Sequence, residues 1–277
     1  MKTDIRLIAT DLDGTLLNTR KEFTERTISA IRRAVENGAV FVPATGRSIR
    51  VVPDYIKGHD FVRHIITLNG ARIIDLEKQK DIAVNALDNR TALEIMEFMD
   101  SLPVIYECCF DNLNRMGAAH KAKIREFTVD EDTYRMLLTE RAQVPDLKKS
   151  VTEWGGLVQK VQFYFPDPAM KPYYLDLLHA RFPRISVASS IVNNVEMTHI
   201  RANKGDALLT VCEYLGIDPA QAMAFGDDLN DLGMIRAAGV GVAMGNAYEA
   251  VKTQADLVAP TCDEDGVAQV IEKLCLR

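Results

Sequence analysis

The stretch "IATDLDGTLL", residues 8–17, decides how the rest of this sequence is interpreted. It places two carboxylates, Asp11 and Asp13, directly after a short apolar run, and a Gly-Thr pair follows them. An isolated buried charge is unfavourable unless it is paired, neutralised or bound to a metal. The two acids therefore either lie in a solvated turn or face a cation. The other motifs of the sequence distinguish these two possibilities.

Strand and helix patterns alternate around this stretch and again at the far end of the chain. Buried strands are predicted at 5–10, 39–43 and 65–68, and a helix capped by Thr24 and ended at Gly38 separates the first two. The last third of the chain predicts helices at 204–215, 231–238, 247–253 and 266–274 and strands at 222–225, 240–243 and 256–259. This alternation is typical of a parallel sheet covered by helices on both faces, so the predicted fold class is α/β.

The middle of the chain has a different pattern. Longer helical segments are predicted at 91–101 and 168–180, and strands at 104–110, 157–165 and 185–190. We interpret this region as a second, α+β domain inserted into the first. The predicted domains are 1–82 for the first part of the core, 83–193 for the inserted domain and 194–277 for the second part of the core.

Composition narrows the classes of function. The 277 residues are 47% hydrophobic and 26% charged, with a formal net charge of −6, which argues against general binding to nucleic acid or anionic membranes. The apolar run Ile5–Ala9 is interrupted by Arg6 and is too short for the core of a signal peptide. No apolar stretch is long enough to span a membrane, and the five cysteines form no CxxC pair. We therefore expect a cytoplasmic protein with reduced cysteines.

Four polar clusters follow predicted strands or begin a predicted helix. They are Asp11–Thr15, Thr45–Arg47, Asn203–Gly205 and Gly226–Asp231. Because loops at the carboxyl ends of parallel strands converge on one crevice, we expect the clusters to lie together. Each cluster alone has an ordinary explanation as a turn or a helix start, but their joint occurrence in this order is hard to explain by packing.

The residue types in these clusters favour a phosphate group and a hard cation. Asp11, Asp13, Asp227 and Asp231 cannot all be charged in one crevice without a counter-ion, and Mg²⁺ prefers oxygen ligands. With the cation bound, Asp11 can attack a phosphorus to form an aspartyl-phosphate. Asp13 can protonate the leaving oxygen and then deprotonate the attacking water.

Other residues of the clusters can bind the phosphate or the substrate. Thr45 can donate a hydrogen bond, Lys204 can supply a positive charge, and Gly14 allows backbone N–H groups to turn toward the phosphate. The candidate phosphate- or substrate-binding residues are Gly14, Thr45, Gly46, Arg47, Lys204 and Asn230. An EF-hand is disfavoured because Leu16 stands where a loop from Asp11 needs glycine, and no Walker A loop is present.

These residues resemble the motifs of the haloacid dehalogenase superfamily and, more narrowly, of its Cof-type phosphatases with a type IIB cap. Asp11–Leu16 is similar to the first motif, Thr45 to the second, Lys204 to the third, Asp227 with Asp231 to the fourth, and Leu68–Ala71 to a stretch that precedes the cap. The resemblance implies a Rossmann-like core, with a cap inserted between the second and third motifs that supplies specificity.

The resemblance also implies roles for individual residues. Asp11 would be the nucleophile and Asp13 the acid–base group, and Asn230 would help to orient the phosphate. Mg²⁺ would be held by Asp11, the Asp13 backbone carbonyl and Asp227, with Asp231 in support. The sequence departs from the pattern before Lys204, where His199 replaces a usual proline and Arg201 a usual glycine. We hypothesise that one of these two residues contacts a second anionic group on the substrate.

The sequence thus predicts a Mg²⁺-dependent phosphatase that hydrolyses small phosphorylated metabolites, such as sugar phosphates or phosphorylated cofactors. Two alternatives stay open, namely a phosphomutase or phosphotransferase on the same core and a non-catalytic ligand-binding regulatory protein. We expect a small-molecule substrate and neither nucleic acid nor a membrane as partner. The sequence does not distinguish a monomer from a dimer.

Overall fold

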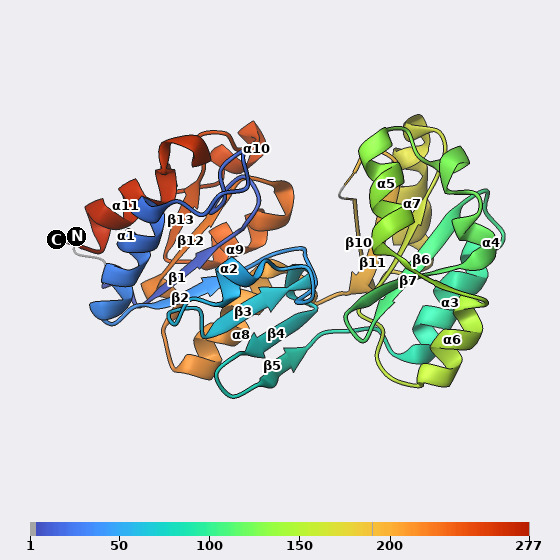
Figure 1. The fold of residues 1–277 in the computed structure, drawn as a ribbon, viewed down its shortest axis with the longest axis horizontal. Helices are drawn as coiled ribbons and strands as arrows, with labels where there is room; N and C mark the ends of the chain where they lie inside the picture. Colours follow the sequence, from blue (N-terminus) through green and yellow to red (C-terminus); the bar gives the residue numbers. More distant parts are fainter. Residues whose placement is uncertain (1–3, 190, 277) are drawn as a thin grey trace. The chain divides into compact units, whose positions relative to one another are not determined.

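The computed structural model describes residues 4–189 and 191–276, and within them the chain divides into two compact units. One unit runs up to Val84 and resumes at Asn203, and the other comprises Asn85–Ala202. We call the first the core unit and the second the cap unit (Figure 1). The first boundary lies close to the predicted one after residue 82.

The core unit is built on a five-stranded parallel sheet with the strand order β14-β13-β12-β1-β2. Its strands are β1 (Leu7–Thr10), β2 (Val40–Pro43), β12 (Ala222–Gly226), β13 (Val240–Ala243) and β14 (Leu257–Val258). The chain passes from β1 to β2 on one side and later adds β12 on the other side of β1. Open α/β sheets bind ligands at the carboxyl ends of the strands beside such a reversal, which here lies next to Asp11.

Helices cover both faces of this sheet (Figure 1). They are α1 (Glu25–Glu36), α2 (Asp54–Lys57), α8 (Lys204–Leu215), α9 (Leu232–Ala237), α10 (Glu249–Lys252) and α11 (Gly266–Leu274). Ile8 packs in one hydrophobic cluster with Ile31 of α1 and Ile271 of α11. Its neighbour Leu7 packs in another with Leu208 of α8. Successive residues of β1 thus face opposite layers, and the predicted α/β fold class is confirmed.

The ends of α1 follow the sequence signals. Thr24 caps the helix by accepting a hydrogen bond from the Thr27 N–H, and Gly38 beyond the other end has a φ of 97°. Because a positive φ favours glycine, the helix stops where the sequence predicts it. A three-stranded antiparallel sheet completes the core unit. Its strands are β3 (His64–Thr67), β4 (Arg72–Asp75) and β5 (Lys80–Val84), and a short 3₁₀ turn at Leu68–Gly70 joins the first two.

The cap unit contains a six-stranded sheet with the strand order β10-β11-β9-β6-β7-β8. Its strands are β6 (Ile105–Phe110), β7 (Leu113–Gly117), β8 (Ala142–Val144), β9 (Lys160–Tyr164), β10 (Ile185–Ala188) and β11 (Asn194–His199). Its helices are α3 (Asn89–Met99), α4 (Ala118–Lys121), α5 (Glu131–Glu140), α6 (Leu147–Trp154) and α7 (Lys171–Arg181). The strand predicted at 185–190 corresponds to β10, and residue 190 lies outside the described residues.

The second boundary of the cap unit differs from the predicted one. We expected the core to resume at residue 194, but β11 pairs with β9 and β10 and therefore belongs to the cap sheet. Val195 and Met197 of β11 are buried in the hydrophobic cluster of the cap unit. No strand was predicted at residues 194–199, and a strand pattern does not specify which sheet the strand joins, so the sequence alone could not place the boundary.

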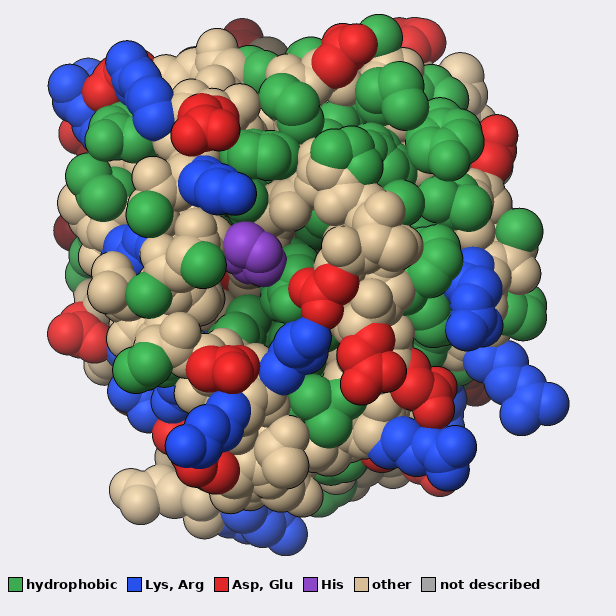
Figure 2. Space-filling model, turned by 90° about the vertical axis from the view of Figure 1, so that its right-hand side faces the viewer, with side chains coloured by type: hydrophobic (Ala, Val, Ile, Leu, Met, Phe, Trp, Pro, Cys, Tyr) green, Lys and Arg blue, Asp and Glu red, His purple; other side chains and the backbone are tan. Residues whose placement is uncertain are grey.

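Two surface properties bear on the classes of partner. No helix in the described part of the chain has both the length and the apolar character needed to cross a membrane. Figure 2 shows Lys and Arg side chains interspersed with Asp and Glu side chains over the face that it presents.

The five cysteines are free thiols and four of them are buried, as expected for packing residues.

Candidate active site

Lys204 lies at the centre of a buried cluster of charges. Helix α8 begins at this residue because Asn203 caps the helix by accepting a 2.8 Å hydrogen bond from the Asp206 N–H. The Lys204 ammonium donates to Asp11 Oδ1 and to Asp231 Oδ1, each at 2.6 Å. Lys204 and Asp231 are fully buried, and Asp11 is 8% exposed. The cluster therefore joins the end of β1, the start of α8 and the loop after β12.

Asp231 uses both of its carboxylate oxygens within the protein. While Oδ1 accepts from Lys204, Oδ2 accepts from the backbone N–H groups of Asp227 at 2.9 Å and Asp228 at 3.1 Å. These bonds fix the loop after β12 against α8. Asp231 is therefore suited to supporting its neighbours rather than to binding a ligand by itself.

Asp227 ends β12 and faces the loop that follows β1. Its Oδ1 accepts a 2.8 Å hydrogen bond from the Thr15 hydroxyl. Gly14 has a φ of 78°, and a Cβ at that position would lie 2.4 Å from Asp227 Oδ2. Glycine is therefore required at position 14 both by the backbone conformation and by the close approach of this carboxylate.

The buried carboxylates could hold a metal ion. Asp11, Asp227 and Asp231 each offer an oxygen, and these three atoms lie within 4.8 Å of one another. An all-oxygen donor set suits a hard divalent cation rather than a soft transition metal. Within residues 4–189 and 191–276, no hydrogen bond takes up Asp11 Oδ2 or Asp227 Oδ2, so these oxygens fit the requirement for metal ligands.

The electrostatics of the cluster favour a bound cation. Burial raises the pKa of Asp11 to about 7 against the opposing effect of Lys204, and Asp231 and Asp227 contribute to the increase. Burial likewise raises the pKa of Asp227 to about 6. Although burial acts against the charge of Lys204, Asp11 and Asp231 raise its pKa above the ordinary value. The lysine stays charged, and a divalent cation would favour the ionised form of the remaining carboxylates.

Asp13 belongs to a second, more exposed cluster. Arg47 donates from Nε to Asp13 Oδ2 at 2.8 Å and from Nη2 to Oδ1 at 2.6 Å, and Lys21 Nζ donates to Oδ1 at 2.8 Å. Burial alone would raise the Asp13 pKa, but the hydrogen bonds and charges of Arg47 and Lys21 hold that pKa below its usual value. In this arrangement two cations fix the orientation of the Asp13 carboxylate.

The loops after β2, β3 and β12 are tied together through Asn69. The Asn69 N–H donates to the Thr45 carbonyl at 3.0 Å, and Asn69 Oδ1 accepts from Asn230 Nδ2 at 3.1 Å. A Cβ on Gly46 would lie 3.2 Å from the same Oδ1. Thr45 is buried, and its hydroxyl accepts from the Arg47 N–H at 3.1 Å. The candidate catalytic, metal and phosphate-binding residues predicted from the sequence all lie in the core unit, in the loops that follow its strands or, for Lys204, at the first residue of α8.

Sequence reasoning missed three residues that contact this site. Lys21 binds Asp13, Asn69 links two loops, and Asn246 Nδ2 donates to the Gly14 carbonyl at 2.8 Å. Asn69 lies in the stretch Leu68–Ala71, whose resemblance to a family motif marked the stretch but did not give a role for Asn69. Nothing in the local sequence pattern marked Lys21 or Asn246.

The two residues that depart from the motif pattern lie in the cap unit. His199 ends β11, and the backbone N–H of Arg201 donates to His199 Nδ1 at 3.2 Å. Arg201 is exposed. A contact of either residue with the substrate stays a hypothesis.

Comparison with known proteins agrees with the motifs. A family model described as haloacid dehalogenase-like hydrolase matches residues 8–271. The 5-amino-6-(5-phospho-D-ribitylamino)uracil phosphatase YcsE of Bacillus subtilis (strain 168) is 31% identical over 268 residues, which cover 97% of this chain and 95% of the relative. The match extends over the core and cap units alike.

Solved structures share the fold. A haloacid dehalogenase-like hydrolase from Bacteroides thetaiotaomicron has a TM-score of 0.78 at 29% identity, covering 98% of this chain and 99% of the other. The HAD subclass IIB sugar phosphatase BT4131 has a TM-score of 0.80 at 20% identity, covering 98% and 100%, and at that identity the likeness concerns the fold alone. The resemblance predicted from the sequence is confirmed, and this chain belongs to the haloacid dehalogenase-like hydrolase family.

Proposed function

We propose that this chain is a Mg²⁺-dependent phosphatase that acts on a small phosphorylated metabolite through an aspartyl-phosphate on Asp11. The observation that carries the proposal is the buried cluster in which Lys204 holds Asp11 and Asp231 at 2.6 Å, beside the carboxylate of Asp227. It combines a fixed carboxylate nucleophile with an all-oxygen cation site. Membership in a hydrolase family with named phosphatase relatives supports the same reaction.

In this proposal Asp11 and Asp227 would hold the metal together with the backbone carbonyl of Asp13, and Asp231 would support them. When bound, Mg²⁺ supplies charge neutralisation and polarises the phosphate oxygens. Lys204 restricts the Asp11 carboxylate to one orientation and adds positive charge for the phosphate. Preorganised charges of this kind act strongly in a site that excludes water.

The reaction proceeds in two steps. Asp11 attacks the phosphorus, the bond from phosphorus to the leaving oxygen breaks, and Asp13, which must enter this step protonated, gives that oxygen its proton. Asp13 then takes a proton from water, the water oxygen attacks the phosphorus, and the bond to Asp11 breaks. Phosphate is released and both carboxyl groups return to their starting states.

The phosphate contacts would come from the loops that Asn69 ties together. Thr45 and Asn230 supply hydroxyl and amide donors, and Gly14 and Gly46 allow the backbone to approach the phosphate closely. Arg47 supplies a guanidinium beside Asp13. We further propose a sugar phosphate or a phosphorylated cofactor as the substrate. The Bacillus subtilis relative is named as a phosphatase of a phosphorylated ribitylamino compound, which supports this class.

The test of the proposal is release of inorganic phosphate from a panel of phosphorylated metabolites, with Mg²⁺ or with EDTA. We expect turnover of at least one sugar phosphate or phosphorylated cofactor with Mg²⁺, and its loss in EDTA. Absence of turnover on the whole panel, or turnover indifferent to EDTA, would overturn the proposal. Slow hydrolysis stimulated by a sugar bisphosphate would instead favour a phosphomutase.

Gly14→Ala and Gly38→Ala form a matched pair that tests the close approach of Asp227. Both glycines have positive φ, so alanine costs about 1 kcal/mol of stability at either position. Only the Gly14 Cβ would meet Asp227, because nothing lies within 4 Å of a Cβ at Gly38. We expect similar small decreases in Tm, but about a hundredfold loss of Mg²⁺-dependent turnover in Gly14→Ala alone. Equal activities in the two variants would contradict this account.

A further inference from the structure

We propose that Lys21 is a positioning residue for Asp13, and that it determines how effectively the protein protonates leaving groups that cannot depart as anions. The inference rests on the proposed function, in which Asp13 is the acid–base group. Lys21 belongs to none of the motifs, and it lies in the loop between β1 and α1. Three observations carry the inference, namely its contact with Asp13, its backbone conformation and the fixation of its loop.

The contact restrains the Asp13 carboxylate at one oxygen. Lys21 Nζ donates to Asp13 Oδ1 at 2.8 Å, and Arg47 Nη2 donates to the same oxygen at 2.6 Å. Arg47 Nε donates to the other oxygen, so three donors hold the carboxylate. The planar fork of Arg47 fixes the plane of the group, and Lys21 is the additional donor on Oδ1.

The backbone of Lys21 has an unusual conformation for its residue type. Its φ is 61°, in the left-handed region where glycine or asparagine is favoured and other side chains are strained. Such conformations persist where the surrounding structure fixes them, and they occur often at functional sites. A lysine at this position is therefore unfavourable for the local backbone. This cost suggests that the lysine side chain serves a function.

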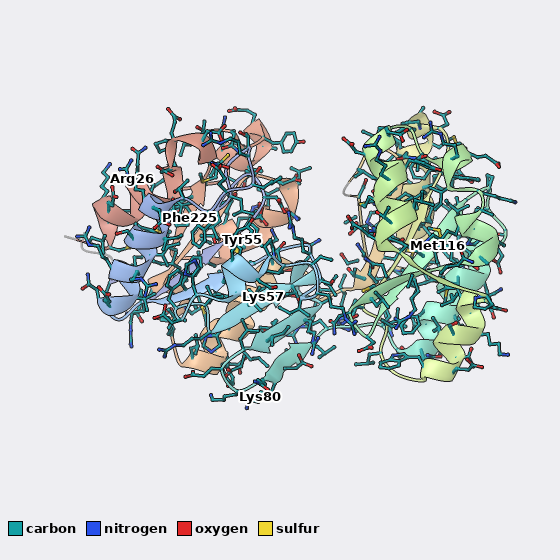
Figure 3. All side chains as sticks on the ribbon, viewed as in Figure 1. Arg26, Tyr55, Lys57, Lys80, Met116 and Phe225 are labelled. Atoms are coloured by element: carbon teal, nitrogen blue, oxygen red, sulfur yellow. The ribbon has the colours of Figure 1, made fainter. Side chains whose placement is uncertain are left out.

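The loop is fixed from both sides of the strained residue. The Lys21 N–H donates to the Asn18 carbonyl at 2.9 Å, and the Lys21 carbonyl accepts from the Tyr55 hydroxyl at 2.8 Å. Tyr55 belongs to α2 and is labelled in Figure 3. The buried Asn18 side chain also accepts from the N–H groups of Arg20 and Glu22 through its Oδ1, at 3.0 and 2.9 Å. The loop thus holds the Lys21 ammonium at Asp13 rather than leaving it free to reorient.

Stability does not explain the contact. The Lys21 side chain is 58% exposed, and ion pairs between exposed side chains contribute little to the free energy of folding. Since the contact also lowers the Asp13 pKa, which opposes proton donation, its benefit to catalysis falls on the orientation of Asp13, which must reach the leaving oxygen within hydrogen-bond distance to act as an acid.

The test compares Lys21→Gly, Lys21→Arg and Arg20→Gln on two kinds of phosphate ester. Glycine removes the side chain and suits the left-handed backbone, and arginine keeps a cation. Arg20 is the matched control, because it is an exposed cation of the same loop that pairs with Glu22 and not with Asp13. One ester is the best alkyl phosphate of the panel, and the other is p-nitrophenyl phosphate, whose leaving group departs without a proton.

We expect Lys21→Gly to lower kcat/KM on the alkyl phosphate by about tenfold, with a change in KM of less than about twofold and no decrease in Tm. The same variant should keep the wild-type kcat/KM on p-nitrophenyl phosphate, because kcat/KM reports formation of the aspartyl-phosphate and not its hydrolysis, in which Asp13 acts as a base whatever the ester. Lys21→Arg should restore most of the lost rate, and Arg20→Gln should match the wild type on both esters. In an Asp13→Asn background, Lys21→Gly should have no further effect, since both changes act through one group.

The outcomes separate this inference from the proposed function. If the wild type hydrolyses both esters and Lys21→Gly equals it, the inference about Lys21 is wrong while the proposed function stands. An equal loss of kcat/KM on both esters would mean that Lys21 does not act through protonation of the leaving group, which also overturns the inference. If the wild type hydrolyses neither ester with Mg²⁺, the proposed function itself fails.

Discussion

Asp11→Asn should abolish phosphate release from every substrate, with a loss of several orders of magnitude in kcat, as for other covalent catalysts that lose their nucleophile. An amide cannot form the aspartyl-phosphate, whereas its carbonyl oxygen can still accept from Lys204. The variant therefore removes the chemistry and leaves the packing intact. In the wild type, the covalent phosphate should be trapped by acid quenching and found on Asp11 by mass spectrometry.

Asp11→Asn should be no less stable than the wild type. The pH dependence of the free energy of unfolding tests this. The folded pKa of Asp11 is raised to about 7 from 3.8, so the folded state binds more protons than the unfolded state between these values. The free energy of unfolding of metal-free protein therefore decreases as pH rises through this window. Asp11→Asn should reduce that decrease, measured by denaturant unfolding in EDTA at pH 5 and pH 7.5. Residual metal-dependent turnover, or a phosphate trapped on another residue, would refute Asp11 as the nucleophile.

The sequence predicted the parts of the site that depend on the order of strands. Asp11, Thr45 and Asp227 each follow a strand of one parallel sheet, and the carboxyl ends of such strands meet at a single edge. Lys204 was predictable for a related reason, because Asn203 is a recognisable cap that fixes where α8 begins. In these cases a local signal combined with a general rule of topology was enough.

The remaining contacts depend on tertiary structure that no local pattern encodes. Lys21 reaches Asp13 only because its backbone is left-handed and Tyr55 binds its carbonyl. In the cap unit, the buried Glu107 accepts a 2.8 Å hydrogen bond from Arg141, and these two residues are 34 positions apart in the sequence. Pairings of this kind are set by which surfaces meet on folding, so a sequence pattern cannot specify them.

Lys204→Met should have the largest effect on the fold of any single substitution in the site. The ammonium is fully buried and is the hydrogen-bonding partner of two carboxylates, Asp11 and Asp231. Removing one member of a buried ionic group leaves uncompensated charge, which destabilises proteins by about 3–5 kcal/mol. We expect a decrease of this size at pH 7.5 in denaturant unfolding, together with the loss of phosphate release. Methionine approximates the length of the lysine stem, so a cavity explains little of the decrease.

Two comparisons identify the cause as buried charge. Arg26→Met removes a cation from an exposed pair with Glu272 at 2.8 Å in the same unit, and it should change stability only slightly. The double variant Lys204→Met with Asp231→Asn removes one of the two orphaned carboxylates, and it should recover part of the stability but none of the activity. Recovery of activity as well would show that Lys204 serves only the fold.

The pH dependence of Lys204→Met provides a further check on this explanation. Lys204 lowers the pKa of Asp11, so its removal should raise that pKa beyond the already elevated value. A buried carboxyl with a raised pKa takes up a proton in the folded state as pH falls, and its penalty then disappears. The destabilisation by Lys204→Met should therefore be smaller at pH 5 than at pH 7.5. A destabilisation that does not change with pH would instead indicate that the substitution lost packing contacts. The contribution of Lys204 to stability would then come from the packing of its side chain and not from its charge.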